Sequence, residues 1–481
     1  MTKFANPIKV LRSSSRAALL VSTALLVASC AAIPNLGSAP SPKRVETYAA
    51  VQSLSAPKVD WPSEEWWKAY GDPQLDALIG EALSAAPTLT EAAARVRQAD
   101  AFTQQAGAAR QPQLSANASV SAVKQSYNNG VPAAGVPKGW NDAGQGGLNF
   151  SYEFDFWGKN RAALDAAISS AEAARADQAQ ARLALATAIA SAYADLVQLY
   201  ADRDASSDAV VVRTRTVELL SERLAQGLEN QGAVKQAESG RASAEGQLAS
   251  IDEAIGLTKN RLAALAGAGP DRGLALQCPQ TLSMPPFGLP ANLQAELIGR
   301  RPDIVASRLR AEAAAERTKS AKAEFYPNIN LSAVIGLQSL GLNALTKSGS
   351  DYGSIGPAIS LPIFNGGRIE GNYRGARAEY DAAVAAYDAA VVQALNDVAD
   401  VATSARALGL RLEKGREALA TSDQAYQIAQ NRYRGGLSNY LEVLSAEDSL
   451  IANRQALADL ETRAFALDVA LVRALGGGFQ H

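Results

Sequence analysis

The segment PTLTEAAARVRQADAFTQQAGAARQPQL, residues 87–114, aligns without a gap on PDIVASRLRAEAAAERTKSAKAEFYPNI, residues 302–329. Each copy begins with a proline, which suits the first turn of a helix, and each has a second proline that ends it. Further on, GLENQGAVKQAE from Gly227 aligns on GLSNYLEVLSAE from Gly436. A repeat of roughly 200 residues is too long for a solenoid and indicates a duplicated half-molecule.

Two segments in each half alternate between apolar and polar residues, a pattern that predicts β-strands with one apolar and one polar face. Pro357 and Pro362 count against the last of these strands, because proline donates no ladder hydrogen bond. Residues 128–147 are rich in Gly, Pro and Asn and predict an exposed loop. The four strands are expected at about 112–123, 146–157, 326–338 and 353–364.

Long alanine-rich stretches without proline follow each pair of strands, from Gly158 to Gly227 and from Gly366 to Gly436. As continuous helix, about 70 residues would reach roughly 100 Å. Each stretch ends at a Gly-Leu turn and is followed by a return helix. The sequence therefore predicts two long antiparallel hairpins, at 158–267 and 366–475, which fit either a coiled-coil scaffold or a tunnel wall.

The N-terminus has the features of a secretory signal, residues 1–29, with four basic residues before an apolar run from Ala17 to Val27. That run is too short to cross a bilayer as a helix, which needs about 20 residues. The junction Val27-Ala28-Ser29-Cys30 resembles the lipobox of bacterial lipoproteins, so Cys30 is expected to carry lipid. The alternative is an ordinary signal peptide with an incidental cysteine.

Composition argues against several classes of function. The 46 basic and 48 acidic residues give a net charge of -2, which provides no field to attract nucleic acid. The only histidine is His481, and no paired-cysteine or phosphate-loop motif is present, so we expect no metal, no cofactor and no enzyme activity. A carboxylate-dependent hydrolase stays open as an alternative, with Glu153 and Asp155 as its best acid pair.

Strands of about ten residues are long enough to cross a bilayer at a tilt, although soluble hairpins on a core would show the same alternation. Four strands cannot close a membrane barrel, because the smallest barrels use about eight and lipid tolerates no open edge. A dimer would provide eight strands and a trimer twelve. Only the larger barrel keeps an open lumen, so a trimer is favoured.

Several motifs together resemble the NodT-type lipoprotein branch of the TolC-like outer-membrane factors. They run from Trp66 and Trp67 through YGDPQLDALI, EFDFWGKNRAALDAA, ELIGRRPDI, AKAEFYPNINLSA and GSIGPAISLPIFNGG to DVALVRALGGG. The resemblance implies a mainly α-helical homotrimer, with a 12-stranded transmembrane β-barrel in the outer membrane continued by an α-helical periplasmic tunnel. It also implies export of drugs or other small molecules, in partnership with a membrane-fusion adaptor and an inner-membrane pump of the RND type.

The same resemblance implies roles for residues of RYRGGLSNYLEVLSAE. Tyr433 matches a constriction tyrosine and Glu442 a gate acid, whereas Ser438 and Ser445 replace an arginine and an aspartate of some members. Glu442 could equally be a solvated surface acid. The turn residues Gly227, Leu228, Gly436 and Leu437 are expected to contact the adaptor, and the glycines also to cap helices.

Glu153 and Asp155 alternate with aromatic residues on the second predicted strand, and we expect them to face the lumen and favour cations. A lipid-anchored periplasmic adaptor is a rival interpretation, but it would not repeat the entire unit of strands and helices. The expected organisation is a signal peptide at 1–29, a lipidated linker at 30–60, a first efflux repeat at 61–270, a linker or equatorial segment at 271–300 and a second repeat at 301–478.

Overall fold

A computed structural model describes residues 33–128, 132–280 and 283–480. The chain divides into two compact units. Of the described residues, the first unit comprises those within 33–41, 97–173 and 308–386, and the second those within 42–96, 174–307 and 387–480. The expected signal peptide and Cys30 lie outside the described residues.

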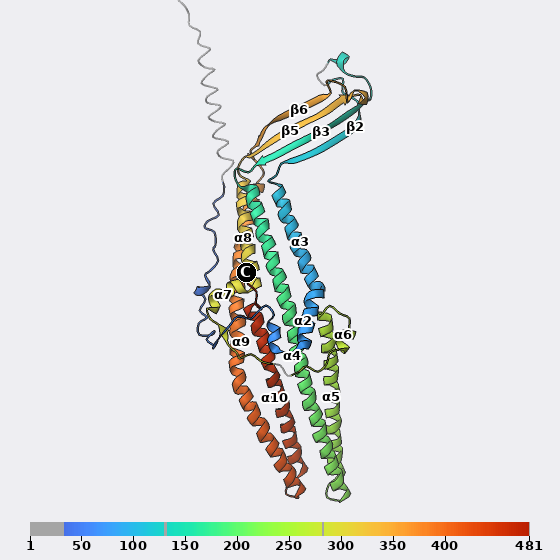
Figure 1. Cartoon of the computed structure of the whole chain (residues 1–481), viewed down its shortest axis with the longest axis vertical. Coiled ribbons are helices and arrows are strands. Elements are labelled where there is room, and N and C mark those ends of the chain that lie inside the picture. Colours follow the sequence, from blue (N-terminus) through green and yellow to red (C-terminus); the bar gives the residue numbers. More distant parts are fainter. Residues whose placement is uncertain (1–32, 129–131, 281–282, 481) are drawn as a thin grey trace, which may run out of the picture. The chain divides into compact units, whose positions relative to one another are not determined.

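The first unit contains a four-stranded antiparallel sheet of order β2-β3-β5-β6, whose strands lie side by side in Figure 1. The strands are β2 (Gln113–Val123), β3 (Asn141–Phe154), β5 (Asn328–Leu340) and β6 (Asp351–Ser360). Their register pairs Leu114 with Phe150, Leu148 with Ile335 and Ala333 with Ile355. Directly paired residues share a face, so the four apolar rows predicted from the sequence form one apolar face.

Three strand ends differ from the predicted bounds by three residues or more. β3 begins at Asn141 rather than 146, because residues 141–147 pair with β2, and residues 143–147 also pair with β5, despite the glycines of this segment. It stops at Phe154, since the Asp155 carboxylate accepts hydrogen bonds from the first N–H groups of the next helix. β6 ends at Ser360, before Pro362, but retains Pro357 in its interior.

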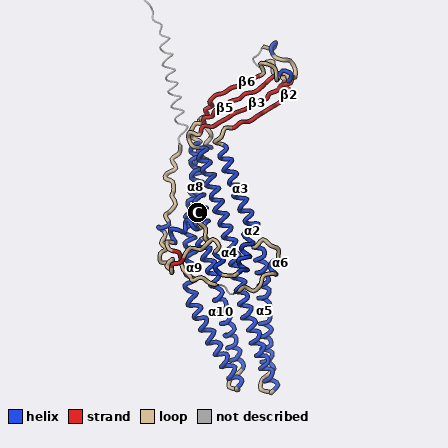
Figure 2. The backbone as a smooth tube through the Cα atoms, viewed as in Figure 1, coloured by secondary structure: helices blue, strands red, loops and turns tan. Residues whose placement is uncertain are grey.

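The helices of the two repeats match closely in length. Helices α3 (Pro87–Ala108) and α8 (Pro302–Ala323) each have 22 residues, and α4 (Lys159–Ala225) and α9 (Arg368–Arg434) each have 67. The return helices are α5 (Gln231–Leu265) and α10 (Tyr440–Leu475). Both arms of each predicted hairpin are therefore helical, drawn in blue in Figure 2, and a short turn joins them.

The second unit has its core around the segment that begins at Trp66. There η2 (Trp66–Tyr70) and α2 (Pro73–Ala85) pack on α4 and α10 through Tyr193, Phe465 and neighbouring apolar residues. Tyr70 donates a 2.6 Å hydrogen bond to Asp468, and Tyr193 donates one of 2.6 Å to Asp72. These buried tyrosines thus have acceptors, as buried hydroxyls require.

Short elements complete this unit. They are η1 (Val45–Thr47), β1 (Lys58–Val59), α6 (Asp271–Leu274), β4 (Leu289–Pro290) and α7 (Leu293–Arg300). β1 pairs in parallel with β4, which joins the N-terminal linker to the segment expected at 271–300. Two further 3₁₀ turns, η3 (Ala133–Gly135) and η4 (Leu342–Ala344), belong to the loops of the sheet.

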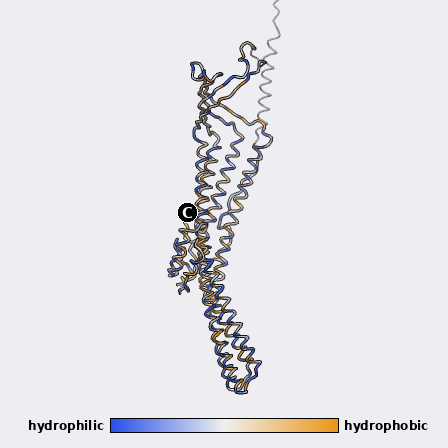
Figure 3. The backbone as a smooth tube through the Cα atoms, turned by 90° about the vertical axis from the view of Figure 1, so that its right-hand side faces the viewer, coloured by the Kyte–Doolittle hydropathy of each residue, from blue (hydrophilic) through white to orange (hydrophobic). Residues whose placement is uncertain are grey.

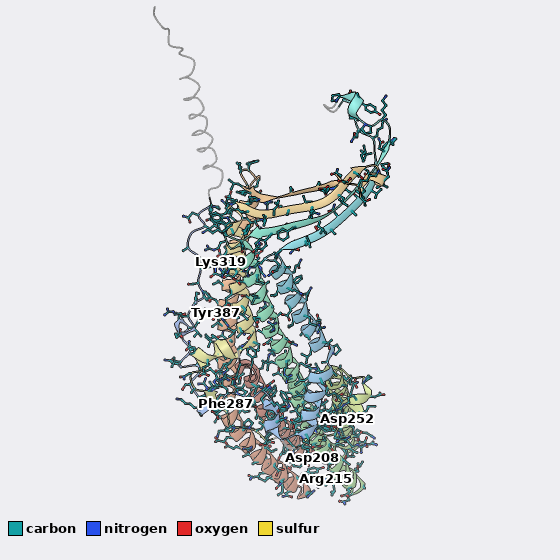
Figure 4. All side chains as sticks on the ribbon, turned by 45° about the horizontal axis from the view of Figure 1, so that its top comes forward. Asp208, Arg215, Asp252, Phe287, Lys319 and Tyr387 are labelled. Carbon is teal, nitrogen blue, oxygen red and sulfur yellow. The ribbon has the colours of Figure 1, made fainter. Side chains whose placement is uncertain are left out.

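Polar and apolar residues intermix along the hairpins of this unit (Figure 3). Ion pairs join their outer surfaces: Arg454 of α10 lies 2.9 Å from Asp208 of α4, and Arg203 of α4 lies 2.6 Å from Asp252 of α5. Asp208 and Asp252 are labelled in Figure 4. Such exposed pairs each contribute at most about 1 kcal/mol, so the apolar contacts between helices dominate the packing.

Candidate functional site

The two hairpin turns lie at the same end of the second unit (Figure 1). Gly227 and Gly436 both adopt left-handed φ values, 74° and 72°, after the last residues of α4 and α9. Leu228 donates its N–H to the Arg223 carbonyl at 2.9 Å, and Leu437 donates to the Arg432 carbonyl at 2.8 Å. The Gly-Leu pairs therefore close both helices in the same way, leaving both leucine side chains exposed.

Tyr433 lies between the two turns and connects them. Its side chain is 2% exposed, and its hydroxyl donates a 2.7 Å hydrogen bond to Glu229, just after the first Gly-Leu pair. The Arg223 guanidinium lies 4.4 Å from the centre of the Tyr433 ring and donates to the Tyr433 carbonyl at 3.1 Å. Tyr433, Glu229 and Arg223, called the tip lock below, thus tie the second hairpin to the first.

Electrostatics fix the proton in the tip lock. Burial raises the pKa of Tyr433, and the hydrogen bond to Glu229 raises it further. The Tyr433 hydroxyl lowers the pKa of Glu229, helped by the Asn230 N–H and by the charge of Arg223. At neutral pH the tyrosine is therefore the donor and an ionised glutamate the acceptor, which is the stronger, charge-assisted kind of hydrogen bond.

Glu442, the other expected gate residue, lies on the exposed surface of the second turn. Among the described residues it makes no hydrogen bond or ion pair with Tyr433. Its N–H donates to the cap residue Asn439 at 3.2 Å, and its carboxylate lies 3.5 Å from Arg432. Ser438 has a buried hydroxyl without a hydrogen-bond partner among the described residues. The structure therefore joins Tyr433 to the first hairpin rather than to Glu442.

Sequence reasoning missed Glu229 and Arg223, because it examined the second hairpin alone. The repeat alignment contained a signal: Glu229 stands opposite Ser438, so only the first turn carries an acid directly after Gly-Leu. The first turn therefore carries a hydrogen-bond acceptor at a position where the second has a serine.

The two acids expected to face the lumen have separate partners. Glu153, at the end of β3, lies 3.0 Å from Lys159, while Asp155 accepts from the N–H groups of Asn160 at 3.2 Å and Arg161 at 2.7 Å. An acid at the start of a helix stabilises it, so Asp155 has a clear structural role. Cys278 is exposed and free.

A family model described as "Outer membrane efflux protein" matches residues 78–268 and 293–477. The chain belongs to the outer membrane efflux protein family. It is 30% identical to the multidrug resistance outer membrane protein MdtP of Escherichia coli K12, over 96% of both chains. The crystal structure of VceC from Vibrio cholerae superposes with a TM-score of 0.82 at 50% identity, covering 87% of this chain and all of that one.

Membership in the outer membrane efflux protein family places the chain in the outer membrane as the channel component of an efflux system. The relatives are channel proteins, which indicates transport rather than catalysis. SilC of Salmonella typhimurium, 28% identical over 96% of this chain and 98% of its own, is named a probable outer membrane lipoprotein. The predicted family resemblance is therefore confirmed.

Proposed function

We propose that three copies of this chain assemble into a single efflux channel, because the edges of its sheet are open. β2 and β6 are the outer strands of the sheet, and no further strand pairs with them among the described residues. In lipid each unpaired backbone group would cost several kcal/mol. Joining β6 of one copy to β2 of the next closes a twelve-stranded barrel.

The apolar face of the sheet supports a membrane location. Leu114, Ile335, Ile355 and Ile359 are each about two-thirds exposed or more on this face. A soluble sheet would cover such a surface, whereas a barrel turns it toward hydrocarbon. The opposite face carries Asn117 and Asn149, which hydrogen-bond to each other at 2.6 Å, and it would line the lumen together with Glu153.

Pro357 is compatible with the strand pairing inside the chain's own sheet. Gln338 donates its N–H to Ser350 at 2.8 Å, so the pair 338 and 350 is hydrogen-bonded, and pairs alternate along an antiparallel ladder. By that alternation the pair of Leu331 and Pro357 is not hydrogen-bonded, and the Pro357 nitrogen points away from β5. The proline therefore costs the sheet of its own chain no hydrogen bond.

The two ends of the channel would have separate roles. At the N-terminus, residues 1–29 would be the signal peptide and Cys30 would carry the lipid anchor, at the start of a linker over residues 30–60. The two efflux repeats would follow at 61–270 and 301–478, with the segment 271–300 between them. The tip lock at Tyr433, with Glu442 as an outer acid, would hold the periplasmic entrance closed. Exposed Leu228 and Leu437, with Gly227 and Gly436, would dock an adaptor linked to an inner-membrane pump.

Exported substrates would be drugs or other small molecules, passing from the periplasm to the exterior without chemical change. The names of the relatives support this class: they include multidrug resistance, fusaric acid resistance and pyoverdine export proteins. Energy would come from the inner-membrane pump. Glu153 and Asp155 would add negative charge near the base of the barrel.

Adjacent residues of β5 test the barrel. Ile335→Lys places a charge on the apolar face and should cost about 2–4 kcal/mol at mid-membrane, whereas Val334→Lys on the opposite face should cost about 1 kcal/mol or less. For both variants, folding into lipid vesicles measures insertion, native mass spectrometry measures the oligomeric state, and planar-bilayer recordings measure conductance. The expected result is a membrane-inserted trimer for wild type and Val334→Lys and little insertion for Ile335→Lys. Equal insertion of the two variants would refute the membrane-facing assignment.

A further inference from the structure

A charged side chain lies fully buried in the second hairpin, above the tip lock. Glu447 of α10 is 0% exposed. Its carboxylate accepts a 2.6 Å hydrogen bond from Thr216 of α4, and its other oxygen lies 3.0 Å from Arg213 of the same helix. Arg213, whose side chain is 16% exposed, also pairs with Asp448 and passes beside Gly240 of α5. One arginine of the first hairpin thus neutralises the buried acid of the second.

The aromatic residues around Glu447 connect it to the tip lock. Tyr426 of α9 and Tyr440 of α10 are buried in the same apolar cluster as Tyr433. The ring centres of Tyr440 and Tyr433 lie 6.3 Å apart. Seven residues separate Glu447 from Tyr440 along α10, a rise of about 10 Å. A displacement of α10 at Glu447 would therefore move the side chains that pack on Tyr433.

The first repeat has a glutamate at the position equivalent to Glu447, but its ion-pair partner comes from the same helix. The repeat places Glu238 of α5 opposite Glu447. Glu238 is not buried, and it pairs at 2.7 Å with Lys235 one turn earlier in its own helix. A surface ion pair of this kind has only a small effect on the folding free energy, because water still solvates both charges. Burying Glu447 instead carries a desolvation penalty that must be offset by its partners. Burial at this position thus depends on contact between hairpins.

We propose that Arg213 and Glu447 are positioning residues of the gate: Arg213 keeps Glu447 buried against α4, and this contact holds α10 where Tyr433 can reach Glu229. The inference rests on the proposed gate. When the entrance opens, Glu447 separates from Arg213 and gains water. Closure then depends on a charge pair that lies outside the tip lock itself.

The pair predicts a defined response to pH. Burial raises the pKa of Glu447, while Thr216 and Arg213 act in the opposite direction and Asp448 adds to the rise. Tyr426 and Tyr440 also face the carboxylate, and burial and the charge of Glu447 raise their own pKa values, that of Tyr440 to about 12, so both stay protonated. A buried carboxylate with a raised pKa binds its proton more tightly when buried than when exposed, so acid favours the closed form.

Arg213→Met makes this dependence large, since it leaves the Glu447 carboxylate buried with Thr216 as its remaining close polar partner. Near pH 7 the conductance of the variant in planar bilayers should rise about tenfold or more. Near pH 5 it should return to within about twofold of wild type, because Glu447 takes a proton. The double variant Arg213→Met, Glu447→Gln should stay within about twofold of wild type at both pH values, because the neutral amide needs no counter-ion.

Two controls separate this inference from the proposed gate. Lys235→Met removes the partner of Glu238, the repeat-equivalent acid, and should leave conductance unchanged. Tyr433→Phe breaks the tip lock and should raise conductance at both pH values. If Tyr433→Phe has no effect, the gate is wrong. If Tyr433→Phe raises conductance but Arg213→Met does not, the positioning role is refuted. It is also refuted if Arg213→Met raises conductance but neither pH 5 nor the added Glu447→Gln change brings the conductance back towards that of wild type.

Discussion

Helices α3 and α8 hold equivalent places in the two repeats and have the same length, but they differ in burial. None of the residues of α3 is buried. In α8 many are, among them Ile304, Val305, Ala306, Leu309, Ala311, Ala313 and Ala314. The alignment places an exposed glutamate of α3, Glu91, opposite the fully buried Ala306 of α8. Duplication has kept the backbone while the surroundings of the two helices have diverged.

The C-terminal ends of the two repeats also differ in how closely they are packed, and the second is again the more tightly enclosed. Gly267 and Gly476 both follow a return helix, with positive φ values of 76° and 91°. A Cβ on Gly476 would overlap the carbonyl oxygen of Arg300, whereas one on Gly267 would meet its nearest neighbours, Ala86 and Pro87, at 3.3 Å. In the second repeat, many residues of α8 and the turn at Gly476 are enclosed by the protein's own chain. The first keeps a free helical face, which a second copy would cover in the proposed trimer.

Exchanging residues between the equivalent helices should give the largest effect. Ala306→Glu buries a carboxylate without a counter-ion in α8 and should cost at least about 3–5 kcal/mol of stability. The reverse exchange in α3, Glu91→Ala, removes only an exposed pair with Arg95 and should cost at most about 0.5 kcal/mol. Urea unfolding followed by circular dichroism measures both. Similar costs for the two exchanges would mean that α3 and α8 are equally covered.

The glycines that end the repeats should give the next largest effect. Gly476→Ala combines left-handed backbone strain with overlap on the Arg300 carbonyl, for a total of about 2–5 kcal/mol. Gly267→Ala adds the strain without severe overlap and should cost about 1–2 kcal/mol. Melting temperatures of the two variants in the same detergent give the comparison, and an equal loss would show that the close approach at Arg300 relaxes freely.

Much of this architecture could be predicted from the sequence because it depends on periodicity. Alternation located the strands, prolines marked the ends of α3 and α8, and the Gly-Leu pairs marked the turns. The strand ends were less certain, since pairing with β2 extends β3 back to Asn141 and hydrogen bonds to the next helix remove Asp155 from it. The local pattern contains neither of these tertiary effects.

The candidate site was only partly predictable. Tyr433 followed from the family resemblance, but Glu229 and Arg223 lie more than 200 residues earlier in the chain, and no local spacing links them to it. Glu447 and Glu238 look alike in sequence, although one is buried and the other is not. The repeat shows which positions correspond, and packing between the hairpins determines which of them are buried.

The smallest effect on a single chain should come from the exposed face of α3. Phe102 is 56% exposed, so Phe102→Ala should change the unfolding free energy of the monomer by no more than about 0.5 kcal/mol. If a neighbouring copy covers α3, the same change removes about 1–2 kcal/mol per copy from the assembly, and the trimer fraction falls on dilution. Native mass spectrometry across a concentration series measures that fraction. Leu274→Ala is the matched control, since Leu274 is also exposed but lies in α6. A trimer equally stable in both variants would show that the free face of α3 stays in contact with water, and the difference between the repeats would then need another explanation.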